Sequence, residues 1–304
     1  MAEPAHGDKR NEESDEEIVR VRLTQDFINV EFDFRAPSDI DLQALIRLFQ
    51  QLFYTNAPQM DLTTVADYVI NLSQNNGIGT VVKVDDMEQI HDPYAVASAV
   101  TIGEPGAAPA ADLLRNYLVK HLTGSASGRP LLELLQGASA NKPLLWFLHE
   151  RMVNLPAQLF PPLLTMLYEE YEEGRQEVSP PAPAPTHMLV FSRAFSLDAV
   201  EEETGLAGAR KRRAPTHAQG DAQSSRGKAA AQKQTPKLGD GLGSFHPEDE
   251  ILAEFATHRF LFRFPPQPDA ADSYEAPIFA RIFALPYDKV PAAIERIRTE
   301  WPVP

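Results

Sequence analysis

The chain has 304 residues, of which 43% are hydrophobic, with a net charge of −15 and no cysteine. The lack of cysteine excludes disulfides, thiol catalysis and thiolate metal sites, and the negative charge favours a basic partner over nucleic acid or anionic membrane. No apolar run approaches the roughly 18 residues of a membrane span, and the charged beginning MAEPAHGDKRNEESDEE does not resemble a secretory signal, so we expect an intracellular protein without membrane insertion.

The first part of the chain divides into a tail and the main part of a domain. Residues 1–18 are almost devoid of apolar side chains, which predicts a disordered acidic tail. Residues 19–202 alternate between strand-like and helix-like patterns, and we expect them to form the main part of an α/β domain. The predicted strands lie at 28–35, 79–84, 94–102, 142–150 and 187–197, and the predicted helices follow Ser38–Asp39 and Asp61 and lie near 110–122, 130–136 and 161–176.

Residues 203–243 have no apolar period and predict a disordered insertion within the domain. Between residues 210 and 237 the insertion carries eight cations against one anion, Asp221, a local net charge of +7 that leaves −22 for the rest of the chain. The cations are Arg210, Lys211, Arg212, Arg213, Arg226, Lys228, Lys233 and Lys237. The run Arg210–Arg213 matches a nuclear localisation signal read by an import receptor. We therefore expect a nuclear protein, with shuttling to the cytoplasm as a further expectation.

Residues 244–304 complete the same domain as helix, strand, strand and helix. Pro247 and the three acidic residues after it suit the first turn of a helix. In HRFLFRFP the phenylalanines alternate with Arg259, Leu261 and Arg263, which favours a core face and an arginine-bearing outer face over a base-stacking strand. The final helix presents one apolar stripe, formed by Val290, Ile294, Ile297 and Trp301.

The order of elements predicts a single mixed-sheet α/β domain. Apart from the extra helix pair and the last helix, this order resembles that of the GCN-five-related N-acetyltransferase (GNAT) fold. Element order does not determine function, so the resemblance alone does not predict an enzyme.

Four stretches resemble the BCCIP/Bcp family of nuclear proteins: VEFDFRAPSDIDLQALIRLFQQLF, HDPYAVASAV, ERMVNLPAQLFPPLL and FHPEDEILAEFATHRFLFRFP. Asn154, Pro156, Pro161 and Pro162 carry the signature of the third stretch, while the basic insertion has no match. The resemblance implies a GNAT-like pseudoenzyme without cofactor. It implies chaperoning of a basic large-subunit ribosomal protein (yeast number twenty-three, universal number fourteen), ribosome biogenesis, and nuclear export linked to a lipid kinase. The animal branch implies contacts with recombination and cell-cycle proteins.

The turn from Arg151 to Leu164 argues against acetyl transfer on the residues themselves. GNAT enzymes bind the cofactor pyrophosphate with the backbone of a glycine-rich turn before a helix. This stretch contains no glycine, and Pro156, Pro161 and Pro162 each lack an N–H donor. We expect no catalytic residues and no cofactor, with a GNAT-type acyltransferase as the least favoured alternative.

Other motifs are weaker. The loop residues Asp85, Asp86, Glu88, His91 and Asp92 could hold a metal, but a turn between strands is ordinarily this polar, so no metal site is predicted. No nucleophile lies in a recognisable elbow, although one sequence does not exclude a hydrolase triad.

The leading hypothesis is a non-enzymatic escort whose acidic surface shields a basic ribosomal protein, and the alternative is a DNA-repair or cell-cycle scaffold. Neither requires direct binding to nucleic acid. The candidate client-binding acids, chosen by charge, are Glu169, Glu170, Glu172, Glu173, Glu201, Glu202 and Glu203.

Overall fold

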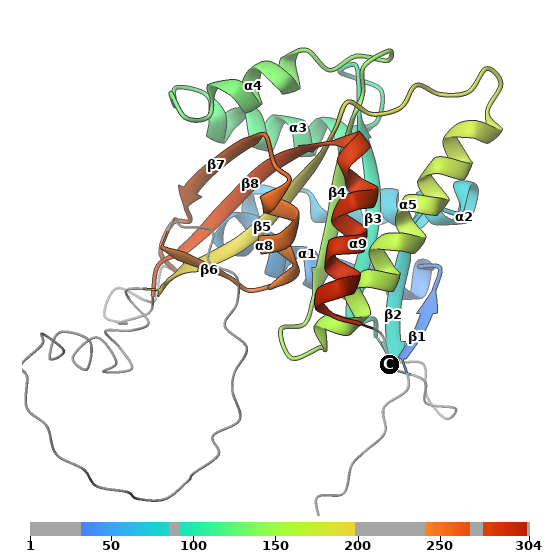
Figure 1. Cartoon of the computed structure of the whole chain (residues 1–304), viewed down its shortest axis with the longest axis horizontal. Coiled ribbons are helices and arrows are strands. Elements are labelled where there is room, and N and C mark those ends of the chain that lie inside the picture. The colour runs from blue at the N-terminus through green and yellow to red at the C-terminus, as the bar shows by residue number, and fades with distance from the viewer. Residues whose placement is uncertain (1–31, 85–91, 198–240, 268–275, 303–304) are drawn as a thin grey trace, which may run out of the picture. The chain divides into compact units, whose positions relative to one another are not determined.

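An eight-stranded mixed sheet runs through the computed structural model, which describes residues 32–84, 92–197, 241–267 and 276–302 (Figure 1). The strand order is β1-β2-β3-β4-β5-β8-β7, and the short β6 pairs with β5. The β4–β5 pair is parallel, and every other pair among the described strands is antiparallel. The strands are β1 (Phe32–Arg35), β2 (Thr80–Val84), β3 (Ala95–Ile102), β4 (Leu144–Arg151), β5 (His187–Ser196), β6 (Leu242–Ser244), β7 (His258–Arg263) and β8 (Ile278–Pro286).

Helices cover both faces of the sheet. One face packs against α1 (Leu42–Phe53), α2 (Leu62–Asn76), α3 (Pro109–Leu122) and α4 (Arg129–Gln136). The other packs against α5 (Phe160–Glu177), α8 (Glu248–Glu254) and α9 (Val290–Glu300). Helices cover β4 on both sides, which explains why its sequence is a nearly continuous apolar run.

Local signals explain the boundaries of α2. Asp61 caps its start by accepting a hydrogen bond from the backbone N–H of Thr64 at 3.1 Å. Gly77 ends the helix in the left-handed conformation with φ of 67°, which glycine adopts without steric cost. The NNGIG stretch is therefore a helix end that leads into β2.

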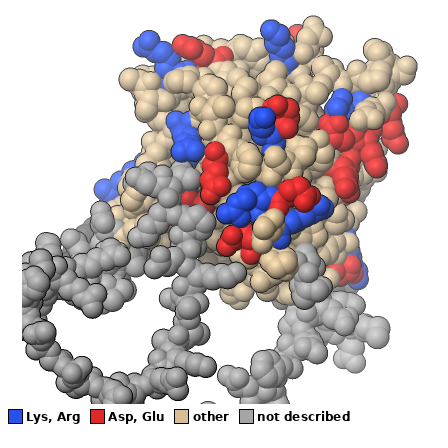
Figure 2. Space-filling view, viewed as in Figure 1, with Lys and Arg blue, Asp and Glu red and all other residues tan. Residues whose placement is uncertain are grey.

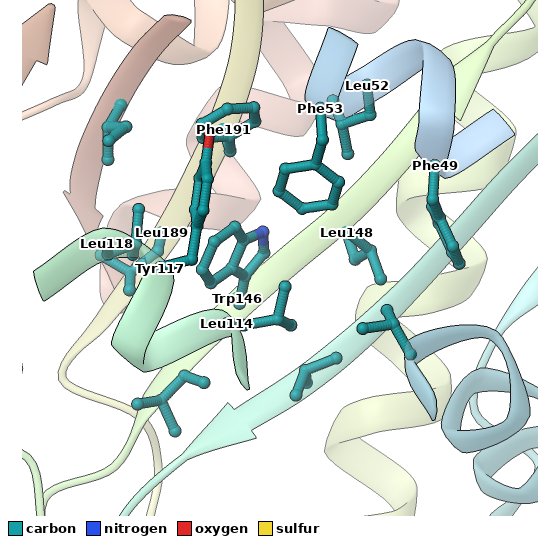
Figure 3. Packing of buried hydrophobic residues seen from close by; sticks show 14 of the residues in the cluster. Phe49, Leu52, Phe53, Leu114, Tyr117, Leu118, Trp146, Leu148, Leu189 and Phe191 are labelled. Carbon is teal, nitrogen blue, oxygen red and sulfur yellow. The ribbon is translucent and has the colours of Figure 1, made fainter. Parts of the chain in front are cut away.

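The core on the α1–α4 face is built around large aromatic side chains (Figure 3). The ring of Phe53 lies 5.2 Å from those of both Tyr117 and Phe191, and Trp146 lies 6.2 Å from Phe191. Each well-oriented aromatic pair contributes roughly 0.5–1.5 kcal/mol beyond the burial of its area. These contacts join α1, α3, β4 and β5 into one core.

Most predicted elements are confirmed, including the buried stripe of the final helix, in which Val290, Ile294 and Ile297 are buried and Trp301 is partly buried. The end of the predicted insertion is wrong. Leu242 and Gly243 belong to β6 and pair with Ser196 and Phe195. This pairing is possible because β4 does not pair with the carboxyl end of β5, which leaves that edge open to β6. Residues 1–31 and 198–240, with the tail and most of the insertion, lie outside the described residues.

Candidate functional site

The parallel strands β4 and β5 pair only at one end. Leu145–Phe147 align with Met188–Val190, whereas β3 and β4 pair along the whole of β4. Beyond this short ladder the carboxyl ends of the two strands diverge, and α8 lies across the opening (Figure 1). We call the space between residues 148–151 of β4 and 191–196 of β5 the wedge.

Three consecutive carboxylates of α8 close the wedge, each bound to a different partner. Glu248 binds Arg151 of β4 in a two-pronged pair at 2.7 and 2.9 Å. Asp249 lies 3.0 Å from His149 Nε2, and Glu250 accepts from Arg281 of β8 at 2.8 Å. All three acidic residues are at most 1% exposed, so their charges depend on these partners.

Glu150 lies at the centre of the wedge and is 1% exposed. It accepts one hydrogen bond from Gln51 of α1 at 2.8 Å and lies 2.6 Å from His246 Nε2, with Arg193 at 3.5 Å. Burial alone would raise the pKa of Glu150, but His246, Arg193 and Gln51 outweigh it and lower that pKa to about 2. The carboxylate is therefore ionised at any physiological pH.

The charges in the wedge balance only if an imidazole is protonated. Four carboxylates face three guanidinium groups, those of Arg151, Arg193 and Arg281. Burial lowers the pKa of His246, but the charge and hydrogen bond of Glu150 outweigh burial, with help from Asp249 and Glu248, and raise it. We define the wedge cluster as these buried groups: His149, Glu150, Arg151, Arg193, His246, Glu248, Asp249, Glu250 and Arg281.

The sequence predicted α8 and the acidic residues in its first turn, but not their role. Their favourable interaction with the helix dipole was enough to explain these acidic residues, so no partner side chain was predicted for them. Their burial follows instead from where α8 packs, against a strand that ends in His149, Glu150 and Arg151. Charges at the end of an otherwise apolar buried strand were the available signal for this cluster.

The proline-rich turn after β4 adopts the predicted course. The α5 helix begins at Phe160 with proline in its first turn, so Pro161 and Pro162 offer no N–H groups there. Pro156 precedes a single 3-10 turn, Ala157–Leu159, and Asn154 is exposed. Arg151 donates to the carbonyl of Leu155 at 2.8 Å and so ties the turn to the wedge cluster.

The predicted client-binding acids of α5 divide into two kinds. Glu170 accepts from the backbone N–H of Gly79 at 2.9 Å, and Glu172 binds Arg175 and the hydroxyl of Tyr287. Burial would raise the pKa of Glu172, but its hydrogen bonds to Arg175 and Tyr287 outweigh burial and lower it. Glu170 and Glu172 are half-buried and take part in these intramolecular contacts, and their role as candidate client-binding acids stays a prediction.

The remaining acidic residues of α5 form an exposed stripe. Glu169 and Glu173 are exposed, as is Glu177, a residue that the sequence reading did not single out. Their four-residue spacing places them on one side of the helix, and Figure 2 shows carboxylates gathered over α5. We define these three residues as the acidic face; none of them forms an ion pair with any residue that the structure describes.

Several predicted residues cannot be placed. The basic run Arg210–Arg213, the acids Glu201–Glu203 and the loop residues Asp85, Asp86, Glu88 and His91 lie outside the described residues. Asp92 of that loop is described and pairs with Arg47. Within the described ranges, no group of three or more histidine and acidic residues has the arrangement of a metal site, and no helix is long and apolar enough to cross a bilayer.

The fold and the wedge define a single mixed α/β domain with a sealed opening at the carboxyl ends of its parallel strands. Residues 27–252 match the family model described as BCCIP, and the chain belongs to this family. It is 43% identical over 313 residues to Protein BCP1 of Mycosarcoma maydis, covering 92% of this chain and 90% of the relative. It is 30% identical to Protein bcp1 of Schizosaccharomyces pombe, covering 86% of each.

A solved structure shares the fold. The crystal structure of BCP1 from Saccharomyces cerevisiae superposes with a TM-score of 0.56 at 19% sequence identity, covering 91% of this chain and 92% of that one. These comparisons confirm the resemblance read from the four stretches.

Proposed function

We propose that this protein is a non-enzymatic escort for a basic protein of the large ribosomal subunit. The observation that carries the proposal is the acidic face of α5, where Glu169, Glu173 and Glu177 are exposed while the acids beside them are used internally. An exposed row of unpaired carboxylates costs little to hold in water and attracts lysine- and arginine-rich segments over about a Debye length.

The absence of catalysis is part of the proposal, and the wedge supports it. In open α/β sheets, ligands bind in the crevice outside the carboxyl ends of the parallel strands. Here Glu150, Arg193 and His246 fill that space from the two strands and the segment before α8. The turn that would hold a pyrophosphate offers proline instead of N–H donors.

Calorimetry with acetyl-CoA tests this part directly. We expect no heat of binding at micromolar concentrations, because opening the wedge would unpair several buried charges. Micromolar binding would overturn the non-enzymatic assignment and revive the acyltransferase alternative.

Affinity purification from the native organism followed by mass spectrometry tests the escort. We expect a basic large-subunit ribosomal protein, such as universal number fourteen, to be recovered in stoichiometric amount and lost at high salt. Recovery of recombination or cyclin-kinase proteins with chromatin would favour the DNA-repair or cell-cycle scaffold instead.

We further propose nuclear localisation through the basic run Arg210–Arg213. Four neighbouring cations in one short segment suit the acidic groove of an import receptor. Replacing all four by alanine should shift a fluorescent fusion from nucleus to cytoplasm. An unchanged nuclear signal would show that import uses another segment or a partner.

A further inference from the structure

Among the strands that the structure describes, β7 lies at the end of the sheet and has one side without a partner strand. It is the last strand in the sheet order, and its partner among the described strands is β8 alone. Figure 1 shows β7 at the margin of the sheet, away from α5. An edge strand presents N–H and C=O groups that another extended chain can bond.

The alternation of hydrogen bonds between β7 and β8 identifies the residues whose backbone groups point away from β8. In an antiparallel pair, every second residue directs its backbone groups to the partner strand. Phe264 donates to the carbonyl of Ile278 at 3.0 Å, so Phe262 and Phe260, two and four residues earlier, also face β8. The backbone groups of Arg259, Leu261 and Arg263 therefore point to the open edge.

The same three residues carry exposed side chains. Leu261 is 39% exposed, one of five large apolar side chains at least this exposed in the described chain, and Arg259 and Arg263 are exposed on either side of it. Phe260 and Phe264 are 7% and 3% exposed and point to the core. An added strand would place its own side chains beside two cations that flank one apolar group.

We propose that the β7 edge binds an extended acidic segment of another protein. The segment would add one strand to the sheet, with an apolar residue opposite Leu261 and an acidic residue two positions away on each side. Backbone hydrogen bonds would supply affinity, and the arginine–carboxylate pairs would supply specificity. This surface goes beyond the escort function, because it selects a partner of opposite charge to the basic client.

Other occupants fit the edge less well. A second copy paired through β7 about Leu261 would place Arg259 opposite Arg263, which brings like charges together. On this described strand, nucleic acid would find little aromatic surface to stack on, since Phe260 is buried and Phe262 is stacked on His121. Arginines can also protect an edge from aggregation, but that role does not require an exposed leucine between them.

The experiment titrates a fluorescein-labelled peptide, TVTETVTETV, into the full chain and follows its anisotropy. The matched control peptide carries lysine in place of glutamate. Leu261→Pro removes one outward N–H without removing a bond to β8, and we expect it to weaken peptide binding about five- to tenfold. Leu261→Val keeps the N–H and should bind as the unmodified chain does.

Arg263→Glu should weaken the acidic peptide about tenfold and improve binding of the lysine peptide. Hydrogen exchange followed by NMR gives a second readout. The amides of Leu261 and Arg263 should exchange fast in the free protein and slowly with peptide, whereas those of Phe260 and Phe262 should be slow in both states.

Three results would overturn the proposal. One is no change in anisotropy up to about millimolar peptide. Another is Leu261→Pro, shown to be folded by its melting curve, binding as tightly as the unmodified chain. The third is protection of the outward amides without peptide in a protein with the mass of a dimer. If Leu261→Pro does not fold, unchanged binding by Arg263→Glu contradicts the proposal equally.

Discussion

The wedge cluster and the acidic face of α5 use the same residue types for opposite purposes. In the wedge, Glu150, Glu248, Asp249 and Glu250 are at most 1% exposed and each has a cationic or imidazole partner. On α5, the carboxylates of the acidic face are exposed and form no such pairs among the described residues. Both groups contribute equally to the net charge of −15, so the net charge does not distinguish them.

Solvent explains the difference. A carboxylate that loses water must find a compensating charge, so the wedge acids are tied to the fold and unable to meet a partner. An exposed carboxylate keeps its hydration and remains available for binding. Burial, and not composition, therefore separates the acids that serve the fold from those that remain available to a partner.

Breaking one buried pair should have the largest effect. Arg151→Met leaves the Glu248 side chain without its guanidinium partner in a site that is closed to solvent. We expect the free energy of unfolding, measured with urea, to fall by about 3–5 kcal/mol. The double variant Arg151→Met/Glu248→Leu should recover part of this loss, because it removes the unpartnered carboxyl group as well.

The surface pair Arg47–Asp92 provides the matched control. Both side chains are more than half exposed, so Arg47→Ala should change stability by no more than about 0.5 kcal/mol. Equal losses for Arg151→Met and Arg47→Ala would mean that the wedge is open to water.

The pH dependence of stability should reflect His246. Its folded pKa is raised above 6.5 by Glu150, Asp249 and Glu248, against the effect of burial. The folded state therefore holds this proton more tightly, and its contribution to stability is complete below pH 6.5 and lost as the pH rises through the raised pKa.

The contribution of Glu150 to stability changes with pH in the opposite direction. Its pKa is lowered from 4.5 to about 2, so its contribution is complete above pH 4.5 and is lost as the pH falls toward 2. Urea midpoints should therefore be highest between pH 4.5 and 6.5. His246→Gln should flatten the alkaline fall, and His187→Gln on β5 should not, because burial lowers the pKa of His187. An unchanged alkaline fall in His246→Gln would show that the imidazole is not the titrating group.

Substitutions along α5 should separate the two kinds of acid within one helix. Glu170→Ala removes the acceptor for the backbone N–H of Gly79, and we expect a loss of about 1–2 kcal/mol. Glu173→Ala removes an exposed side chain, and we expect a change within about 0.5 kcal/mol. Thermal melting of both variants provides the comparison, and similar losses would contradict the division.

The order of elements was predictable because the hydrophobic periods are strong. The apolar run of β4 and the capped α2 have local signals, Asp61 and Gly77 among them, that are read without tertiary information. The strand β6 was missed because Leu242–Ser244 is three residues long and becomes a strand only by pairing with β5.

The charged sites were only partly predictable. Whether Glu170 or Glu173 faces a neighbour depends on the position of Gly79, which is far from both in sequence. Likewise, Glu248 and Arg151 are 97 positions apart, and one sequence does not reveal their contact. The shortage of N–H donors in the turn before α5, by contrast, was predictable from the sequence, because Pro161 and Pro162 lack N–H groups in any fold.

The most direct test measures the affinity of the protein for purified large-subunit ribosomal protein, universal number fourteen, at low and high salt. Glu169→Gln/Glu173→Gln should weaken binding about five- to tenfold at low salt and reduce its salt dependence. Asp67→Asn/Glu133→Gln removes the same charge from exposed positions on the helices of the opposite face and should leave affinity nearly unchanged. Equal affinity for all three proteins would contradict the assignment of the acidic face as the client-binding surface.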